Sequence, residues 1–358
     1  MTPTFSSKPI QVLVVDDSVV VRGFVVRCLT ADPRVEIVGS CSNGEMAIAQ
    51  VVRKKADVIV LDIEMPVMDG IEALPKLLQA CPGVRIVMAS TLTQRNAAIT
   101  MRALSLGAAD YIAKPATNQL RASEEFGREL IRKVVALGNR VSTIGVREPR
   151  SATPPKLESR PSISRTPALI AIGSSTGGPK ALLTLLGNLS PAVKCPIVIA
   201  QHMPPTFTTV LAQHIAQASG RPCREAEDGM AINAGAIYLA PGDYHLVLAA
   251  GSNGVIARLN QAPPENFCRP SVDPLFRTVA KLFGPAGCAV VLTGMGSDGC
   301  AGARVMAAGG ATILAQDEAT SVVWGMPGAV AQAGICTAIL PLPRIAGYLT
   351  SLFRERAA

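Results

Sequence analysis

The sequence predicts an α/β fold with two doubly wound domains, each built on a mostly parallel sheet. Short β-branched runs alternate with segments of helical spacing over residues 11–140, and the alternation resumes at residue 168. Such alternation is typical of βαβ units, whose crossover connections make neighbouring strands parallel. A segment rich in Pro, Ser and Arg separates the two stretches. We therefore expect domains at residues 10–140 and 168–358, joined by a flexible linker over residues 141–167.

Five apolar runs of the first domain are expected to form buried strands, because they are short, β-branched and separated by helical patterns. Two clear helical patterns cover residues 44–55 and 70–81. The resulting size lies within the usual range for one domain. The expected strands cover residues 11–16, 35–41, 57–62, 84–90 and 109–113.

The linker differs in composition from both domains. Residues 142–167 contain five prolines, many Ser and Thr, scattered Arg and Lys, and almost no apolar periodicity. Such a composition favours an extended, solvated chain. Its positive charge is therefore interpreted as that of a tether, in preference to a nucleic-acid-binding arm.

The second domain repeats the alternation of strands and helices. A hairpin is expected over residues 244–259, where Gly-Ser-Asn-Gly supplies the turn. The expected strands of the series cover residues 168–173, 196–201, 236–240, 288–294 and 311–316.

Composition argues against several function classes. The net charge is +8 but no dense basic run occurs, and aromatic residues make up only 4%, which disfavours a base-stacking nucleic-acid surface. The nine cysteines are scattered and form no C-x-x-C pair, as expected for reduced thiols in the cytoplasm. Neither a signal peptide nor an apolar stretch of about 20 residues is evident. We expect a cytoplasmic protein with no nucleic-acid partner and no direct membrane insertion.

Polar side chains end the expected strands of the first domain. Asp16 and Asp17 follow the first strand, Asp62 ends the third, Ser90 ends the fourth, and Lys114 follows the fifth. In open α/β sheets the ligand site lies at the carboxyl ends of the strands. Any one Asp could simply cap a helix, but capping is a poor account of all these strand ends together. Clustered carboxylates suit Mg²⁺, and a carboxylate can act as a nucleophile toward phosphorus.

The segments VLVVDDSVVVR, DVIVLDIEMPVMDG, IVMAS and DYIAKP resemble the receiver domain of bacterial two-component response regulators, which has a flavodoxin-like fold. The resemblance implies that a histidine kinase phosphorylates Asp62. It implies that Asp17, Asp62 and the backbone carbonyl of Glu64 coordinate Mg²⁺, with Asp16 close by. It further implies two switch positions and a phosphate-contacting lysine, which are Ser90, Tyr111 and Lys114.

The loop over residues 173–177 reads G-S-S-T-G and lies between an expected strand and an expected helix. This G-x-S-x-G pattern is that of a nucleophile elbow, in which a sharp turn presents the central Ser175. A phosphate-binding loop of the G-x-x-x-x-G-K-[ST] type is the alternative. That alternative fails because Pro179 occupies the position of the required lysine. The bare motif is only moderate evidence for a nucleophile.

A serine nucleophile needs a base and an orienting acid. His202 directly follows an expected strand, whereas His214 lies within an expected helix and His245 begins the hairpin as a structural residue or a substrate contact. Two acids follow strands, Asp298 on a Gly-rich turn and its competitor Asp317. Before any family is considered, capping of the next helix explains Asp298 as well as catalysis does.

The segments GSSTGG, QHMP, LTGMGSDG, RPSVDPLF and AQDEATSVVWGMPGAV resemble the catalytic domain of chemotaxis protein-glutamate methylesterases, a three-layer α/β/α domain. The resemblance implies that Ser175 is the nucleophile, His202 the base and Asp298 the orienting acid. It also implies that the backbone N–H of Met295 stabilises the oxyanion and that Thr176 lines the site. Ser174 stands where the family often has alanine, which leaves open which hydroxyl attacks.

Both resemblances together imply a phosphorylation-regulated serine esterase. Its substrates would be glutamate γ-methyl esters, and specific glutamines for deamidation, on methyl-accepting chemotaxis receptors, whose methylation it resets during adaptation. The receiver would inhibit the catalytic domain until Asp62 is phosphorylated. We expect Mg²⁺ for receiver phosphorylation and no cofactor for ester hydrolysis. A chemotaxis histidine kinase would be the phosphodonor, and the protein is expected to be a monomer.

Two other classes remain open from the sequence. One is a binding-only regulator that keeps the fold but acts in another pathway. The other is a DNA-binding response regulator, which needs a helix-turn-helix output. The strand–helix series of the second domain argues against that output.

Overall fold

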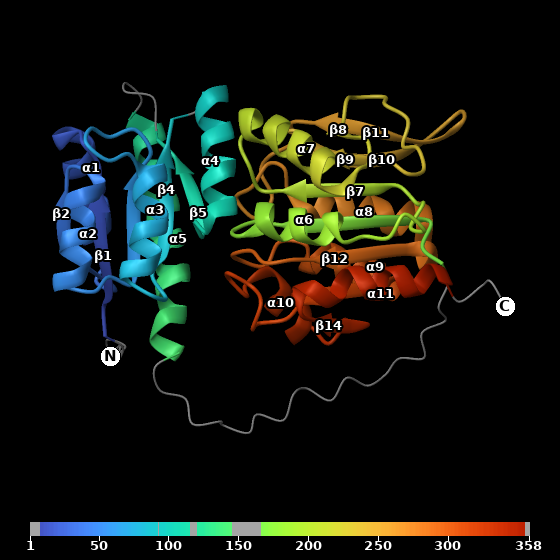
Figure 1. The fold of residues 1–358 in the computed structure, drawn as a ribbon. Helices are drawn as coiled ribbons and strands as arrows, with labels where there is room; N and C mark the ends of the chain where they lie inside the picture. Colours follow the sequence, from blue (N-terminus) through green and yellow to red (C-terminus); the bar gives the residue numbers. More distant parts are fainter. Residues whose placement is uncertain (1–7, 92, 115–119, 145–165, 355–358) are drawn as a thin grey trace. The chain divides into compact units, whose positions relative to one another are not determined.

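The computed structural model describes residues 8–91, 93–114, 120–144 and 166–354. The chain divides into two compact units, Met1–Ser151 and Ala152–Ala358. Figure 1 shows that each unit is a sheet covered by helices. Each unit therefore carries the α/β architecture predicted from the sequence.

Unit 1 is built on a five-stranded sheet of order β2-β1-β3-β4-β5, in which all neighbouring strands are parallel. This order is that of flavodoxin-like, doubly wound proteins. The central strand β3 is buried along its whole length, which explains its continuous apolar run. The strands are β1 (Ile10–Val15), β2 (Val35–Cys41), β3 (Val58–Asp62), β4 (Arg85–Ser90) and β5 (Asp110–Ala113).

Helices cover both faces of this sheet (Figure 1). Helix α1 (Val19–Thr30) contacts α5 (Leu120–Ile144), whereas α3 (Gly70–Ala80) contacts both α2 (Gly44–Arg53) and α4 (Gln94–Leu106). Helix α5 ends inside the segment 141–167 that was expected to be linker. Residues 145–165 of that segment lie outside the described residues.

Four helices of unit 1 begin in the same way. The side chain at each N-cap accepts a hydrogen bond from a backbone N–H in the first turn. These bonds satisfy N–H groups that have no partner within the helix. The capped helices follow the carboxyl ends of the strands, so the turns that carry the polar strand-end residues are fixed. The capping residues are Ser18, Asn43, Asp69 and Thr93.

Unit 2 is built on a seven-stranded parallel sheet of order β14-β13-β12-β6-β7-β9-β8. The five strands expected from the sequence are present. The edge strands β8 and β14 were not expected, because three residues are too few to carry a periodic pattern. The strands are β6 (Leu169–Ser174), β7 (Ile197–Gln201), β8 (Cys223–Glu225), β9 (Ile237–Leu239), β12 (Gly287–Val291), β13 (Thr312–Gln316) and β14 (Ala338–Leu340).

The helices of unit 2 complete three layers. Helix α6 (Gly178–Gly187) contacts α7 (Pro205–Ser219) and α11 (Leu342–Arg354). Helix α9 (Cys300–Ala308) contacts α8 (Val272–Phe283) and α10 (Met326–Gln332). This architecture is not a helix-turn-helix output, so the DNA-binding alternative is wrong.

The expected hairpin consists of β10 (His245–Gly251) and β11 (Gly254–Asn260), which form a separate antiparallel sheet. Strand β10 packs on α8, which ties the hairpin to the core of unit 2. That core includes Val198, Leu246, Phe276 and Val291, all of which are fully buried. Within the described ranges of the chain, no helix is long and apolar enough to cross a membrane.

Candidate active site

The turn after β6 and the residue after β7 lie side by side at one edge of the unit 2 sheet. Ser174 is paired in register with Gln201, so Ser175 and His202 occupy the next position on each strand. The backbone N–H of His202 donates to the carbonyl oxygen of Ser174 at 3.1 Å. Neighbouring strands lie about 4.8 Å apart, so the sheet brings the two candidate catalytic residues together.

The turn that carries Ser175 joins β6 directly to α6. Gly177 adopts a left-handed conformation with φ +75°, and Pro179 occupies the first turn of the helix. A Cβ atom at position 177 would lie 2.5 Å from Cγ2 of Val322. Glycine is therefore required both by conformation and by space. This geometry is the sharp strand-to-helix turn that the G-x-S-x-G pattern predicts.

The two neighbouring serines differ in environment. Ser174 is fully buried, and its Oγ donates to Oε1 of Gln201 at 2.6 Å. The amide of Gln201 in turn donates to the carbonyl oxygens of Ser175 and His202, at 3.0 and 3.1 Å. Ser175 is partly exposed. Ser174 therefore has a structural partner within the fold, and Ser175 is the hydroxyl that solvent and substrate can reach.

His202 contacts Asp298 across the site. Nε2 of the imidazole lies 2.7 Å from Oδ2 of the carboxylate, and the two side chains are only 11% and 1% exposed. Because a carboxylate accepts hydrogen bonds, Nε2 carries the proton. The other ring nitrogen, Nδ1, is then the one that can accept a proton during catalysis. Asp317, the competing acid, instead accepts hydrogen bonds from the backbone and the hydroxyl of Thr320.

Asp298 is held in place by the N-terminus of α8. Its carboxylate accepts hydrogen bonds from Ser271 Oγ at 2.8 Å and from the backbone N–H groups of Val272 and Asp273 at 2.6 and 3.1 Å. It also accepts from the N–H of Gly299 at 2.8 Å. Asp298 thus caps α8, which precedes it in sequence, whereas the capping alternative assigned it to the following helix.

These contacts shift the protonation of both partners. Burial acts to raise the pKa of Asp298, but hydrogen bonds from His202, Val272 and Ser271 outweigh it and lower the pKa to about 2. Burial acts to lower the pKa of His202, yet the sulfur of Cys268 and the carboxylate of Asp298 raise it to about 10. A protonated His202 is therefore stabilised beside the ionised Asp298, and this is the pair that forms when a serine proton is transferred.

The segment after β12 packs against the serine turn. A Cβ atom on Gly294 would lie 2.9 Å from the Cβ of Ser175, and Thr293 Oγ1 donates to the carbonyl oxygen of Thr176 at 2.9 Å. No residue in the described part of the chain accepts a hydrogen bond from the N–H of Met295. Met295, the expected oxyanion donor, directly follows Gly294, which packs against this turn.

His245 has a structural place. It is buried, its Nε2 lies 3.2 Å from the carbonyl oxygen of Pro263, and its Nδ1 accepts from the N–H of Ser271. His245 therefore supports the residue at the N-cap of α8. His214 lies within α7, as expected from the sequence, and is partly exposed.

Three residues of the site were missed in the sequence reasoning. Gln201 joins the turns of Ser175 and His202 through its side-chain amide. The amide of Asn266 donates to Asp273 and Asp298 at 3.0 Å each. Sγ of Cys268 lies 3.3 Å from Nδ1 of His202. Their positions in the sequence could have indicated them. Gln201 directly precedes His202, and Asn266 and Cys268 lie just before the RPSVDPLF segment.

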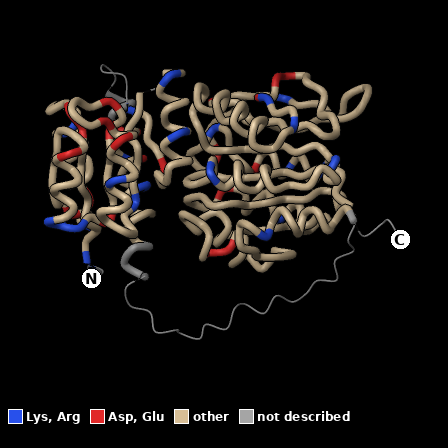
Figure 2. Tube along the Cα trace, viewed as in Figure 1, with Lys and Arg blue, Asp and Glu red and all other residues tan. Residues whose placement is uncertain are grey.

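Unit 1 brings its strand-end carboxylates together. Ligand oxygens of Asp16, Asp17 and Asp62 all lie within 4.8 Å of one another. Nζ of Lys114 lies 2.7 Å from Oδ2 of Asp16 and 2.7 Å from Oδ1 of Asp62. Figure 2 marks acidic residues in red in the loops at the end of this unit that lies away from the N-terminus. The strand-end residues predicted to converge are therefore adjacent.

The chemistry of this cluster fits Mg²⁺. Three carboxylates supply the hard oxygen ligands that the ion prefers. Burial raises the pKa of Asp62, with Lys114 acting against the rise and Asp16 adding to it. Burial acts to lower the pKa of Lys114, but Asp62 and Asp16 reverse this effect and raise it. A second cation would further stabilise the ionised carboxylates.

The two candidate switch residues are both buried. Ser90 Oγ accepts from Thr100 Oγ1 at 3.1 Å and donates to the carbonyl oxygen of Thr91 at 3.3 Å. Tyr111 lies in β5, and burial raises its pKa well above the ordinary value. Nζ of Lys133 lies 5.1 Å from the centroid of the Tyr111 ring. Both hydroxyl-bearing side chains therefore lie within the fold of unit 1.

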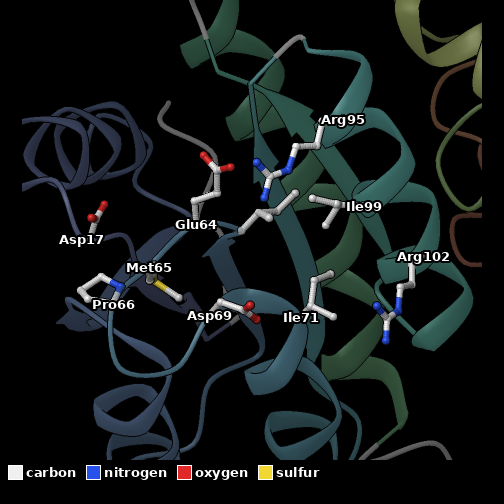
Figure 3. A pocket seen from close by; sticks show the side chains of 10 residues that line it. Asp17, Glu64, Met65, Pro66, Asp69, Ile71, Arg95, Ile99 and Arg102 are labelled. Carbon is white, nitrogen blue, oxygen red and sulfur yellow. The ribbon is translucent and has the colours of Figure 1, made fainter.

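A hollow of about 690 Å³ opens beside the carboxylate cluster. Figure 3 shows Asp17 and Glu64 on one side of it and Arg95 and Arg102 of α4 on the other. Glu64 is exposed, follows Asp62 by two residues and lines this hollow together with Asp17. The lining residues are Asp17, Ile63, Glu64, Met65, Pro66, Asp69, Ile71, Arg95, Ile99 and Arg102.

The fold and the two sites define a two-domain signalling protein, in which a receiver-type unit precedes a hydrolase-type α/β/α unit. Family models match both units. The response regulator receiver domain matches residues 12–123, and CheB methylesterase matches residues 170–349. The chain belongs to the CheB methylesterase family.

Curated relatives span nearly the whole chain. A protein of Paramagnetospirillum magneticum is 48% identical over 99% of this chain and 99% of its own, and it is named protein-glutamate methylesterase/protein-glutamine glutaminase 1. A protein of Azospirillum brasilense, named protein-glutamate methylesterase/protein-glutamine glutaminase, is 48% identical over 98% of this chain and 94% of its own. The solved CheB methylesterase catalytic domain of Thermotoga maritima is 41% identical, with a TM-score of 0.50, over 51% of this chain and 97% of its own.

Proposed function

We propose that this protein is a phosphorylation-regulated serine esterase that hydrolyses glutamate γ-methyl esters on methyl-accepting chemotaxis receptors. The proposal includes deamidation of specific receptor glutamines. The observation that carries it is the contact between His202 and Asp298 beside the partly exposed Ser175. The names of full-length relatives at 48% identity supply the substrate class.

Acylation begins with attack of Ser175 Oγ on the carbonyl carbon of the glutamyl ester. Nδ1 of His202 takes the serine proton, and Asp298 stabilises the imidazolium through Nε2. The backbone N–H of Met295 donates to the oxyanion of the tetrahedral intermediate. Thr176 lines the site next to the nucleophile.

Collapse of this intermediate breaks the bond between the carbonyl carbon and the methoxy oxygen. The imidazolium of His202 returns its proton to the leaving oxygen, so methanol departs and an acyl-enzyme on Ser175 remains. Water then attacks the acyl carbon, with His202 again accepting the proton. His202 passes this proton to Ser175 Oγ as the acyl bond breaks, which restores Ser175 and leaves the glutamate side chain of the receptor as a carboxylate. With a glutamine side chain, the same steps release ammonia.

The receiver-type unit is proposed to accept a phosphoryl group on Asp62 from a chemotaxis histidine kinase. Mg²⁺ held by Asp17, Asp62 and the carbonyl oxygen of Glu64, with Asp16 close by, would offset the added negative charge. Lys114 would contact the phosphoryl oxygens, and Ser90 with Tyr111 would respond to them. We place this reaction in the cytoplasm and assign the protein as a monomer.

The regulatory part of the proposal is that unit 1 inhibits the esterase until Asp62 is phosphorylated. A phosphoryl group adds about −1.5 to −2 charge, which is enough to reorganise the contacts of Lys114. The test compares esterase rates of the full chain with and without a small-molecule phosphodonor and Mg²⁺. We expect a faster rate after phosphorylation. Equal rates would remove the regulatory part and leave the esterase assignment intact.

The esterase assignment is tested on receptor-containing membranes that carry radiolabelled methyl esters. We expect the full chain to release labelled methanol above the background of membranes alone. The competing class, a binding-only regulator, predicts receptor binding with no release. Glutamine deamidation is followed in parallel by the mass of receptor peptides.

A further inference from the structure

A thiol lies against the ring nitrogen that the esterase needs. The loop between β11 and α8 brings Sγ of Cys268 to 3.3 Å from Nδ1 of His202. Nε2 on the other side of the ring is occupied by Asp298 at 2.7 Å. The ring is therefore held between a carboxylate and a sulfur atom, and Nδ1 faces the sulfur.

The loop that carries Cys268 is anchored on both sides. The amide of Asn266 donates to Asp273 and Asp298 at 3.0 Å each. The guanidinium of Arg269 donates to Oδ1 of Asp243 at 2.6 and 3.0 Å. These contacts flank Cys268 and fix its backbone. These contacts therefore hold the sulfur of Cys268 at its short distance from Nδ1 of His202.

Cys268 differs from the other cysteines, all nine of which lie in described parts of the chain. It is partly exposed, whereas Cys41, Cys81, Cys195, Cys288 and Cys336 are buried. Cys195, Cys223 and Cys336 have no imidazole at hydrogen-bond distance, and burial raises the pKa of each to about 12. A thiol must lose its proton to act as a nucleophile. Of the nine cysteines, only Cys268 lies at hydrogen-bond distance from an imidazole nitrogen.

We propose that Cys268 is a site of reversible covalent modification by hydroperoxides, and that its modification stops ester hydrolysis by Ser175. The second half rests on the proposed esterase function, whereas the first half depends only on the contact between Cys268 and His202. Sulfur, imidazole and carboxylate form the same kind of relay that activates a serine hydroxyl. Two nucleophiles therefore compete for one nitrogen.

The modification is a two-electron oxidation of the Cys268 sulfur, and the hydroperoxide is the oxidant that is reduced. Nδ1 of His202 takes the thiol proton, the sulfur of Cys268 attacks one oxygen of the hydroperoxide, and the O–O bond breaks. Sulfur becomes sulfenic acid, and the departing oxygen takes the proton from His202 to leave as water or an alcohol. A small thiol then displaces water from the sulfenic acid to give a mixed disulfide. A second small thiol releases Cys268 and leaves as the disulfide of the two.

Modification stops hydrolysis because of where the new oxygen lies. A sulfenic acid adds an atom and a hydrogen-bond donor at the side of the ring where Nδ1 must meet Ser175. The nitrogen is then occupied by a group that returns no proton to a leaving methoxide. With Nδ1 occupied in this way, His202 can no longer act as the base for Ser175.

The first experiment follows the modification itself in the full-length protein. Hydrogen peroxide is added together with a cyclic diketone that traps sulfenic acids, and the labelled peptides are identified by mass spectrometry. We expect labelling at Cys268 to exceed that at Cys28, Cys223 and Cys300, which are also partly exposed. In His202→Ala we expect labelling of Cys268 to slow by at least about tenfold, since its base is gone. Labelling of Cys268 at the same rate in both proteins, or none, overturns the proposal.

The second experiment measures methanol release before peroxide, after peroxide and after a small thiol. Wild type is expected to lose most of its rate and to recover it with the thiol. Cys300→Ser is the matched control and is expected to behave as wild type. Cys268→Ser and Cys268→Ala are each expected to keep their own untreated rate, and circular dichroism checks their folding. Inactivation of these two variants by peroxide would show that modification of Cys268 is not what stops ester hydrolysis, and would overturn that part of the proposal. If no variant releases methanol, the esterase function fails, and the labelling comparison still decides the site.

Discussion

Nε2 of His202 lies 2.7 Å from Oδ2 of Asp298, although 96 residues separate them in the sequence. This contact fixes the ring and leaves Nδ1 as the nitrogen that would serve as base in the proposed reaction. The familiar relay of serine hydrolases uses the two nitrogens in the opposite sense. Either ring nitrogen can face the carboxylate, because a neutral imidazole has one nitrogen that donates and one that accepts.

The first prediction concerns the acid. Asp298→Asn replaces an acceptor with an amide that cannot stabilise an imidazolium, so kcat for methanol release should fall by about 10³–10⁴-fold. Asp317→Asn is the matched control, since Asp317 contacts Thr320 and makes no contact with His202. Its kcat should stay within a few-fold of wild type. A large loss in Asp317→Asn with none in Asp298→Asn would exchange the two assignments.

The second prediction concerns pH. Cys268 and Asp298 raise the pKa of His202 to about 10, and only the neutral imidazole can accept the serine proton. The rate of methanol release should therefore keep rising as pH increases from 7 through 9. Cys268→Ser removes the sulfur that raises this pKa, so its profile should shift to lower pH. A wild-type rate that levels off near pH 7 would contradict the raised pKa.

The third prediction concerns phosphorylation of unit 1. Asp62→Asn should incorporate no phosphoryl group from a small-molecule phosphodonor, as measured by intact mass, because the amide is not a nucleophile. Asp32→Asn is the control, since Asp32 pairs with Arg34 on the surface and should leave incorporation unchanged. Chelation of Mg²⁺ should abolish incorporation in wild type. Full incorporation in the presence of chelator would exclude the ion from the reaction.

Much of the fold was predictable because buried parallel strands carry continuous apolar runs. β3 and β6 are buried along their whole length and are plain in the sequence. β8 and β14 are three-residue edge strands whose pairing depends on neighbours far along the chain. Short elements of this kind are fixed by tertiary contacts, which a periodic pattern does not record.

The site was predictable where residues follow strands, and less so where loops converge. His202 and Ser175 follow neighbouring strands, so their proximity is implied once the strand order is known. The contact of Cys268 with His202 joins two loops 66 residues apart and leaves no pattern in the sequence. The partner of Ser174 was equally hidden, because Gln201 lies 27 residues away and meets it only across the sheet.

The central claim is that Ser175, and not its neighbour Ser174, attacks the ester. The most direct measurement is release of labelled methanol from methylated receptor membranes by Ser175→Ala and Ser174→Ala, both checked for folding by circular dichroism. Ser175→Ala should lose at least about 10⁴-fold in kcat. Ser174→Ala should keep most of the wild-type kcat while losing about 1–3 kcal/mol of stability, since Gln201 loses its buried partner. Full activity in Ser175→Ala with loss in Ser174→Ala would contradict the account.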